Sequence, residues 1–285
     1  MLFRKKVVMI LSSIFLSSKY LCLAFLSNKN IMQSNSGFVI SLTSYGRRVK
    51  YVCLTIESLL HQKDIKPEKI VLWLYKRDKP YGIAHFLLKR QVNRGLKIVY
   101  LDDDYKSYKK LSYFQDIEGS HEYVVTVDDD IIYPIKWLKG FFDCTKKNPN
   151  AIYCYRGRII NFDSKDNVTS YNSWRLANKK NLTNNFLLPT GVSGVCYPVR
   201  ALDERVKDFK SISSICPYGD DIWYKMITLT NNFYSELVDA ESIHFTPIIT
   251  GFGKGLEKIN VQSDFNTKQF VESMVHFNVN KQDFM

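Results

Sequence analysis

Three consecutive aspartates, Asp128, Asp129 and Asp130, follow the apolar run VVTV at 124–127. Carboxylates held so close together repel one another unless a cation or hydrogen-bond donors compensate them. Carboxylate oxygens suit Mg²⁺ and Mn²⁺, which keep part of their coordination shell for substrate phosphates. The alternative is a solvated acidic loop before a helix that begins near Pro134, but Asp130 lies too early to cap that helix. The triplet therefore predicts a divalent-metal site.

A separate acidic pair, Asp220 and Asp221, stands at the start of a helix expected over 221–229. Acidic side chains in a first turn are favoured by the helix dipole, so the pair could have a purely structural role. A carboxylate at a helix start beside an open loop is equally suited to act as a general base. Both acids are therefore candidates for catalysis.

Two further features could serve the same chemistry or only the fold. The acidic run 102–104 precedes Lys109 and Lys110, which could simply neutralise it. His244 follows a short strand expected over 236–239, and a lone histidine is as often structural as it is a metal ligand. Both alternatives stay open for each feature.

The segment SLTSYGRR at 41–48 places hydroxyl groups, an aromatic ring and two guanidinium groups after the first expected strand. These groups suit a base, a ribose and phosphates, although a hydrophilic turn would have the same composition. The chain has no GxGxxG and no GxxxxGK[ST], so a dinucleotide fingerprint and a P-loop are excluded. Its six cysteines form no CxxC pair, and no serine lies in a GxSxG elbow, which argues against a thiolate zinc site and against that class of hydrolase.

These candidate groups need a scaffold that brings strand ends together. From residue 37 onward, short apolar runs typical of strands alternate with segments of helical periodicity. This alternation predicts an α/β fold with a mostly parallel sheet flanked by helices, and ligands bind beyond the carboxyl ends of such strands. The strands are expected over 38–42, 69–75, 97–101, 122–127 and 195–199, and the helices over 51–62, 80–94 and 135–144.

The helix expected over 80–94 has a definite inner face. Ile83, Phe86 and Leu87 are expected to point inward, and Gly95 stands where a C-terminal cap is expected. Residues 156–190 are polar and show no clear period. We therefore expect a single compact domain with a regular first half and an elaborated C-terminal half, divided as a leader (1–36), a catalytic domain (37–265) and a C-terminal tail (266–285).

Composition and charge narrow the class of protein. The 285 residues are 45% hydrophobic and 24% charged, which is typical of a globular chain and excludes wholesale disorder. Forty basic and 28 acidic residues give a net charge of +12, which favours anionic partners. A basic nucleic-acid-binding module is one alternative, but no recognised motif or basic stripe accompanies the charge, so we expect no nucleic acid partner.

The leader carries five basic residues and no acid, and its apolar run at 7–26 is interrupted by Lys19. A run of this length after basic residues could form a signal-anchor helix. It could also lie at a membrane interface, or be untranslated if Met32 is the true initiator. We expect a cytoplasmic protein on the inner face of a membrane, with a single-pass membrane protein as the alternative.

Five segments together resemble a known family: VISLTSYGRR, LDDDYKSYKKL, VVTVDDDIIYP, GVSGVCYP and YGDDIWY. They resemble bacterial sugar-nucleotide-dependent glycosyltransferases of the GT-A fold, a Rossmann-like architecture, and look closest to enzymes of surface polysaccharide and lipooligosaccharide synthesis. The likeness covers about residues 37–265. It implies transfer of a sugar from a nucleoside diphosphate sugar, with a UDP-sugar favoured, to a hydroxyl of a glycan or glycolipid acceptor.

The resemblance also implies roles for individual residues. Asp128 and Asp130 match the DxD pair that holds Mn²⁺ or Mg²⁺ on the donor diphosphate, and His244 occupies the place of a late histidine ligand. Asp221, with Asp220 beside it, matches the catalytic base of inverting members. The remaining donor-binding positions would be Thr43, Tyr45, Arg47 and Asp104 around the nucleotide, Asp129 near the ribose or sugar, and Lys110 facing the diphosphate or sugar.

A nucleotidyltransferase is the second enzyme class to consider, since it also joins an α/β sheet to acidic metal ligands. Such enzymes usually carry a glycine-rich, arginine-containing loop after the first strand. The corresponding SLTSYGRR has a single glycine. The sequence therefore favours glycosyl transfer and keeps nucleotidyl transfer as the alternative.

Overall fold

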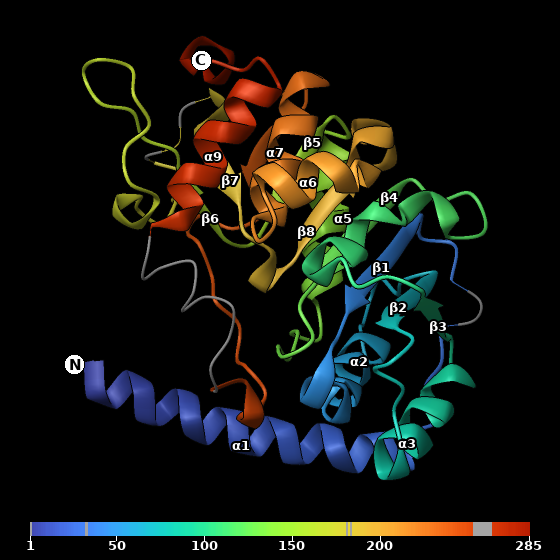
Figure 1. Ribbon diagram of the computed structural model, residues 1–285. Coiled ribbons are helices and arrows are strands. Elements are labelled where there is room, and N and C mark those ends of the chain that lie inside the picture. The colour runs from blue at the N-terminus through green and yellow to red at the C-terminus, as the bar shows by residue number, and fades with distance from the viewer. Residues whose placement is uncertain (1, 32–33, 181, 183, 253–263) are drawn as a thin grey trace.

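A seven-stranded sheet organises the chain in this computed structural model (Figure 1). The structure describes residues 2–31, 34–180, 182, 184–252 and 264–285, so the alternative initiator Met32 lies outside the described residues. In spatial order the strands are β3 (Leu96–Leu101), β2 (Lys69–Tyr75), β1 (Phe38–Thr43), β4 (Tyr123–Val127), β8 (Val195–Pro198), β5 (Ala151–Cys154) and β9 (Tyr234–Leu237).

Most neighbouring strands run parallel, and β8 alone among these seven runs antiparallel to both of its neighbours, β4 and β5. The expected mostly parallel sheet is therefore confirmed. Along β1, Phe38, Ile40 and Leu42 pack into one hydrophobic cluster, while Val39 packs into a cluster on the opposite face. Because both faces of the strand are buried, its sequence is almost continuously apolar.

Helices cover both faces of the sheet. On the face that buries Phe38 and Val125 lie α1 (Leu2–Leu26), α2 (Val52–Leu60), α3 (Gly82–Val92) and α5 (Trp137–Lys147). On the face that buries Val124 and Ile152 lie α4 (Lys109–Ser112), α6 (Phe209–Ile215), α7 (Asp220–Thr230) and α9 (Phe265–His276). A small antiparallel pair, β6 (Gly157–Ile159) and β7 (Leu187–Pro189), lies within the elaborated second half.

The residues expected as a tail are packed into the body of the protein. Phe270 of α9 and Phe284 near the C-terminus are fully buried in the same hydrophobic cluster as Trp223 of α7. Figure 1 shows α9 lying beside α7. This end of the chain therefore contributes to the second hydrophobic core.

The inner face of α3 differs from the expected one. Leu87 is buried as expected, but the side chains of Ile83 and Phe86 are 69% and 51% exposed. The helix is rotated because Gln91 is buried, where its amide donates hydrogen bonds to the Cys53 carbonyl at 2.8 Å and to Glu57 Oε2 at 2.9 Å. The buried face of α3 is therefore formed by Ala84, Leu87, Leu88 and Gln91.

A buried ion pair joins α2 to the end of α3. The Glu57 carboxylate is completely buried and accepts hydrogen bonds from both ends of the Arg94 guanidinium, at 2.8 and 2.5 Å. The following Gly95 has φ +113°, and a Cβ there would lie 2.4 Å from Ile31 Cγ1. The glycine expected at this helix end is therefore required by backbone conformation and by close packing.

Lys225 of α7 is a buried amine, and no carboxylate of the described residues forms an ion pair with it. Its Nζ atom lies 3.4 Å from the Ser235 hydroxyl. Burial lowers the pKa of Lys225 from 10.5 to about 7. Between these two values the unfolded chain holds a proton that the folded protein releases, so the stability of the fold increases with pH across this window.

We expect Lys225→Met to raise the free energy of unfolding near neutral pH by about 1–3 kcal/mol, because it removes an amine from an apolar environment. The increase in stability from about pH 7 upward should become smaller in the variant. Urea unfolding across this pH range measures both effects. Lys268→Met, on the exposed surface of α9, is the matched control. A less stable Lys225→Met protein at pH 7 would contradict this account.

Candidate active site

The aspartate triplet lies where β4 ends. Asp129 is buried. Its carboxylate accepts a hydrogen bond from Ser44 Oγ at 2.5 Å and forms an ion pair with Arg48 at 2.6 Å. Its backbone carbonyl accepts a further bond from Thr55 Oγ1 at 2.9 Å. Asp129 therefore ties the loop after β1 to the end of β4.

Arg48 also pairs with Asp130, so one guanidinium neutralises two members of the triplet. Burial acts to lower the pKa of Arg48, but the charges of Asp129 and Asp130 outweigh it and raise the pKa. Arg47, the arginine expected in the site, is exposed. The sequence places two adjacent guanidiniums after β1, and only the path of the short helix at Gly46–Lys50 selects Arg48 for this contact.

A buried lysine joins the triplet to the second acidic pair. Lys110 Nζ lies 2.9 Å from Asp220 Oδ2 and 3.3 Å from Asp128 Oδ1. Burial acts to lower its pKa, but the charges of Asp220, Asp128 and Asp221 raise it above the ordinary value. The ammonium group therefore stays charged and brings together two acidic segments that are far apart in the sequence.

Gly191 completes this arrangement. Its backbone N–H donates to Asp221 Oδ2 at 3.0 Å. A Cβ at this position would lie 2.8 Å from Lys110 Nζ, 3.3 Å from Asp221 Oδ1 and 3.7 Å from Asp128 Oδ1. Only a glycine leaves room for these three groups around one backbone position. The first of the two glycines in the segment GVSGVCYP was the available sequence signal for this role.

In the described part of the chain, the ion pairs and hydrogen bonds of this site join the carboxylates of Asp128, Asp129, Asp130, Asp220 and Asp221 to Arg48, Lys110 and the Gly191 N–H. The carboxylates outnumber the cations that pair with them in these contacts.

Two carboxylates are only partly compensated. Burial, together with the negative charges of Asp128 and Asp129, raises the pKa of Asp130 to about 7. The positive charge of Arg48 acts in the opposite direction but is outweighed. Burial and the charge of Asp220 likewise raise the pKa of Asp221 to about 7. Carboxylates with such raised pKa values are suited to binding a cation or accepting a proton.

Within the triplet, Asp128 and Asp130 are the more accessible acids, with side chains 33% and 23% exposed. The donor set is all oxygen, which fits Mg²⁺ or Mn²⁺. His244 is exposed, and the half-buried chain around it passes the triplet, because Ile248 N donates to the Asp130 carbonyl at 2.7 Å. Across the described ranges, no three His, Cys, Asp or Glu side chains are grouped closely enough to hold a metal ion.

The other expected donor-binding residues lie around this edge of the sheet. Thr43 Oγ1 donates to the Trp73 carbonyl at 2.8 Å, and Tyr45 is exposed with its ring 5.5 Å from the Arg48 guanidinium. Asp104 forms an ion pair with Lys109 and accepts a hydrogen bond from the backbone of Lys106 at 3.1 Å. For Asp104, neutralisation by the neighbouring lysines is therefore the arrangement observed.

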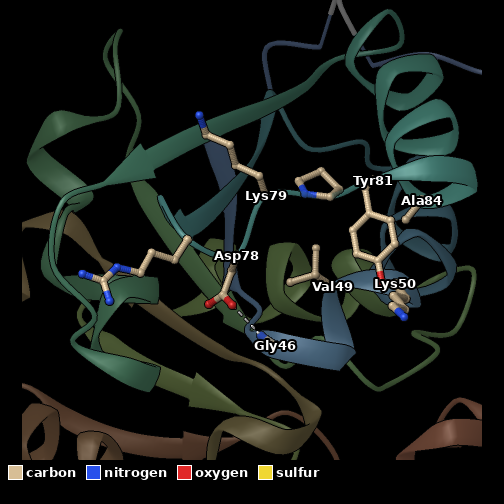
Figure 2. Close-up of a pocket in the computed structure, with 9 residues that line it drawn as sticks. Gly46, Val49, Lys50, Asp78, Lys79, Tyr81 and Ala84 are labelled. Atoms are coloured by element: carbon tan, nitrogen blue, oxygen red, sulfur yellow. Dashed lines mark hydrogen bonds between the residues drawn. The ribbon is translucent and has the colours of Figure 1, made fainter.

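A small cavity of about 110 Å³ opens beside the loop after β1. Figure 2 shows Asp78 directed toward Gly46, whose backbone N–H donates to its carboxylate at 2.9 Å. The cavity wall carries several basic side chains; it comprises Gly46, Val49, Lys50, Arg77, Asp78, Lys79, Pro80, Tyr81 and Ala84. Three of these, 77–79, follow β2, a strand end that we did not single out from the sequence. The cavity therefore adds a mostly basic surface beside the loop after β1, separate from the aspartate triplet.

Comparison with known proteins finds solved structures of low sequence identity. No family model matches the sequence, and no curated protein matches it. Among solved structures, S. aureus TarS 1-349 is 15% identical with a TM-score of 0.48, covering 84% of this chain and 73% of that one. TarS 1-349 in complex with UDP is 15% identical with a TM-score of 0.47, covering 73% and 59% of the two chains. The 4-diphosphocytidyl-2C-methyl-D-erythritol synthase of Anaerococcus prevotii is 13% identical with a TM-score of 0.47, covering 81% and 96%.

We expect Lys110→Met to lower the free energy of unfolding by about 3–5 kcal/mol, because it leaves buried carboxylates without their cation. The double variant Lys110→Met/Asp220→Asn should be less destabilised than the sum of the two single variants, since the two groups contact each other. Urea unfolding of the four proteins at one pH measures the coupling. Additive effects would show that Lys110 does not hold the two acidic segments together.

Proposed function

We propose that the protein is a metal-dependent, inverting glycosyltransferase. It transfers a sugar from a nucleoside diphosphate sugar, with a UDP-sugar favoured, to a hydroxyl of a glycan or glycolipid acceptor. The observation that carries this proposal is the Lys110 bridge, which brings the Asp128 carboxylate and the start of α7 to the same cation. One acidic set suits a cation on the donor diphosphate, and the other suits the removal of a proton from the acceptor.

Asp128 and Asp130 are assigned to Mn²⁺ or Mg²⁺, because they are the accessible acids of the triplet. His244 is proposed as a further ligand only from its place in the sequence, because in the described residues it is not grouped with Asp128 and Asp130. The bound dication would supply neutralisation of the charge that develops on the departing diphosphate. Lys110 and Arg48 add fixed positive charge beside the same acids.

The nucleotide is assigned to the loop after β1. Tyr45 and Arg47 are both exposed there and offer a ring for the base and a guanidinium for phosphate. Thr43 lies at the end of β1 and Asp104 follows the end of β3, as further contacts of the nucleotide. Asp129, assigned near the ribose or sugar, holds Ser44 and Arg48 and thereby positions this loop.

In the proposed reaction the acceptor oxygen forms a bond to the anomeric carbon while the bond from that carbon to the diphosphate oxygen breaks. The electron pair leaves with the nucleoside diphosphate, and the acceptor proton passes to the Asp221 carboxylate. Asp221 is held in place by the Gly191 N–H at 3.0 Å. A carboxylate with a pKa near 7 is well matched to proton removal at neutral pH.

We expect Asp130→Asn to abolish divalent-dependent transfer while leaving the unfolding transition in place. Release of nucleoside diphosphate from a panel of UDP-sugars, with and without Mn²⁺, measures the loss. Asp143→Asn, an exposed aspartate of α5 paired with Lys139, is the matched control and should behave as wild type. Full activity of the wild-type protein without any divalent ion would contradict the metal assignment. Release of pyrophosphate from a nucleoside triphosphate would identify a nucleotidyltransferase instead.

We expect Asp221→Asn to lose about 10²–10⁴-fold in transfer rate while still binding the donor, because it removes the base alone. In the wild-type protein, the rate should rise with pH through about 7, as Asp221 loses its proton and becomes able to accept another. Initial rates across pH and thermal shift with UDP and Mn²⁺ measure the two properties. Normal turnover of the variant would direct attention to Asp220 or to a retaining mechanism.

A further inference from the structure

The N-terminal helix α1 lies against the body of the protein along one narrow stripe. Its buried side chains are Ser13, Ser17, Tyr20 and Ala24, which follow one another at helical spacing. Ser13 Oγ donates to the Pro247 carbonyl at 2.7 Å, and Ser17 Oγ accepts from the Ile249 N–H at 3.0 Å. The stripe that faces the protein is therefore made mainly of small and hydroxyl-bearing side chains.

The end of α1 is also fixed to α3. Arg90 donates hydrogen bonds to the carbonyl of Ala24 at 3.2 Å and to that of Ser27 at 3.3 Å. Ser27 Oγ lies 3.2 Å from the Nε2 atom of His61, which follows α2. In Figure 1, α1 lies along the bottom of the molecule and its C-terminal end reaches α3. The helix is therefore bound to the body along much of its length.

The opposite face of α1 is apolar. Val8, Leu11, Phe15 and Leu26 are between 61% and 77% exposed, and they recur on the side away from the buried stripe. The helix thus buries two serine hydroxyl groups together with Tyr20 and Ala24, with Leu16 and Leu23 packed against the same core, and presents large apolar groups outward. In the described part of the chain, α1 is also the helix that is long and apolar enough to cross a membrane by length and composition.

Helix α3 continues this apolar surface. Ile83 and Phe86, the two residues that α3 leaves outside the core, are exposed, and the Phe86 ring lies 6.1 Å from the ring of Phe25 on α1. We call the combined surface the docking platform. It comprises Val8, Leu11, Phe15, Phe25 and Leu26 of α1 together with Ile83 and Phe86 of α3. Two elements separated by more than fifty residues of sequence therefore expose apolar side chains next to each other.

The charges around the docking platform are positive. The sequence from 1 to 36 contains five basic residues and no acid. Of these, Lys6 and Lys19 are exposed on α1 itself, and Lys89 is exposed on α3. Apolar side chains bordered by lysines complement a bilayer with anionic headgroups, whereas a second copy of this chain would bring like charges together.

We propose that the docking platform binds the surface of an anionic lipid bilayer, with α1 lying in the plane of the membrane while it stays bound to the body. A membrane-crossing α1 would have to leave α2 and α3, which would expose Tyr20 and break the contacts of Ser13 and Ser17. The in-plane arrangement keeps those contacts and buries the outward apolar face. This inference goes beyond the proposed function and does not depend on the donor or on the reaction.

Flotation of the full chain with lipid vesicles tests the proposal. We expect binding to vesicles of phosphatidylcholine mixed with phosphatidylglycerol and weaker binding to phosphatidylcholine alone. The double variant Ile83→Glu/Phe86→Glu should bind the mixed vesicles about tenfold or more weakly, because it places two charges in the apolar contact. Val275→Glu, at an exposed apolar position of α9 outside the docking platform, is the matched control and should bind as wild type.

The α3 variant separates the in-plane arrangement from a membrane-crossing helix. If α1 alone crossed the membrane, Ile83→Glu/Phe86→Glu would bind vesicles like wild type, and this result would overturn the proposal. Phe15→Glu should weaken binding as the α3 variant does. Sedimentation without lipid tests the other contrary outcome. A stable dimer that Phe15→Glu disrupts, in a protein that does not bind vesicles, would show that the surface binds a second copy of the chain. Circular dichroism confirms that each variant is folded.

Discussion

The ammonium group of Lys110 joins two acidic segments inside the protein, and the candidate site is built around this contact. At a separation of about 4 Å, two unit charges near a protein surface interact by about 4 kcal/mol, in repulsion as much as in attraction. Asp128 and Asp220 would therefore move apart without a cation between them. The bare backbone of Gly191 leaves the space in which this cation and Asp221 can meet.

A comparison of two buried charge clusters shows what distinguishes a site from a structural network. Glu57 is completely buried, yet Arg94 and Gln91 satisfy it, and its cluster is nearly balanced in charge. The active-site cluster instead carries five carboxylates and two cations. Such an excess lowers stability unless a ligand compensates it, so its presence in a folded protein indicates a binding role.

Helix α1 shows a comparable excess on the outside of the molecule, where apolar side chains are exposed to solvent. An ordinary surface helix buries its apolar side and exposes its polar side. In α1 apolar side chains lie on both sides, with Tyr20 buried in the core beside Ser13 and Ser17, and Phe15 outside. Rotation of α3 about Gln91 adds Phe86 to the same surface. An apolar face of this kind is stable in water only at a cost, which a lipid surface would remove.

By itself, the sequence determined the residue types and the elements from β1 to β4. The strand 69–75 was predicted with the bounds that β2 has, because a strand buried on both faces must be apolar throughout. The aspartates and Lys110 could also be named, whereas Gly191 could not. Only the tertiary structure decided that Arg48 rather than Arg47 reaches the triplet, that Lys110 bridges two segments, and that Ile83 points outward. Local periodicity reports which side chains are apolar, whereas partners in space depend on how distant elements rotate to satisfy their buried polar groups.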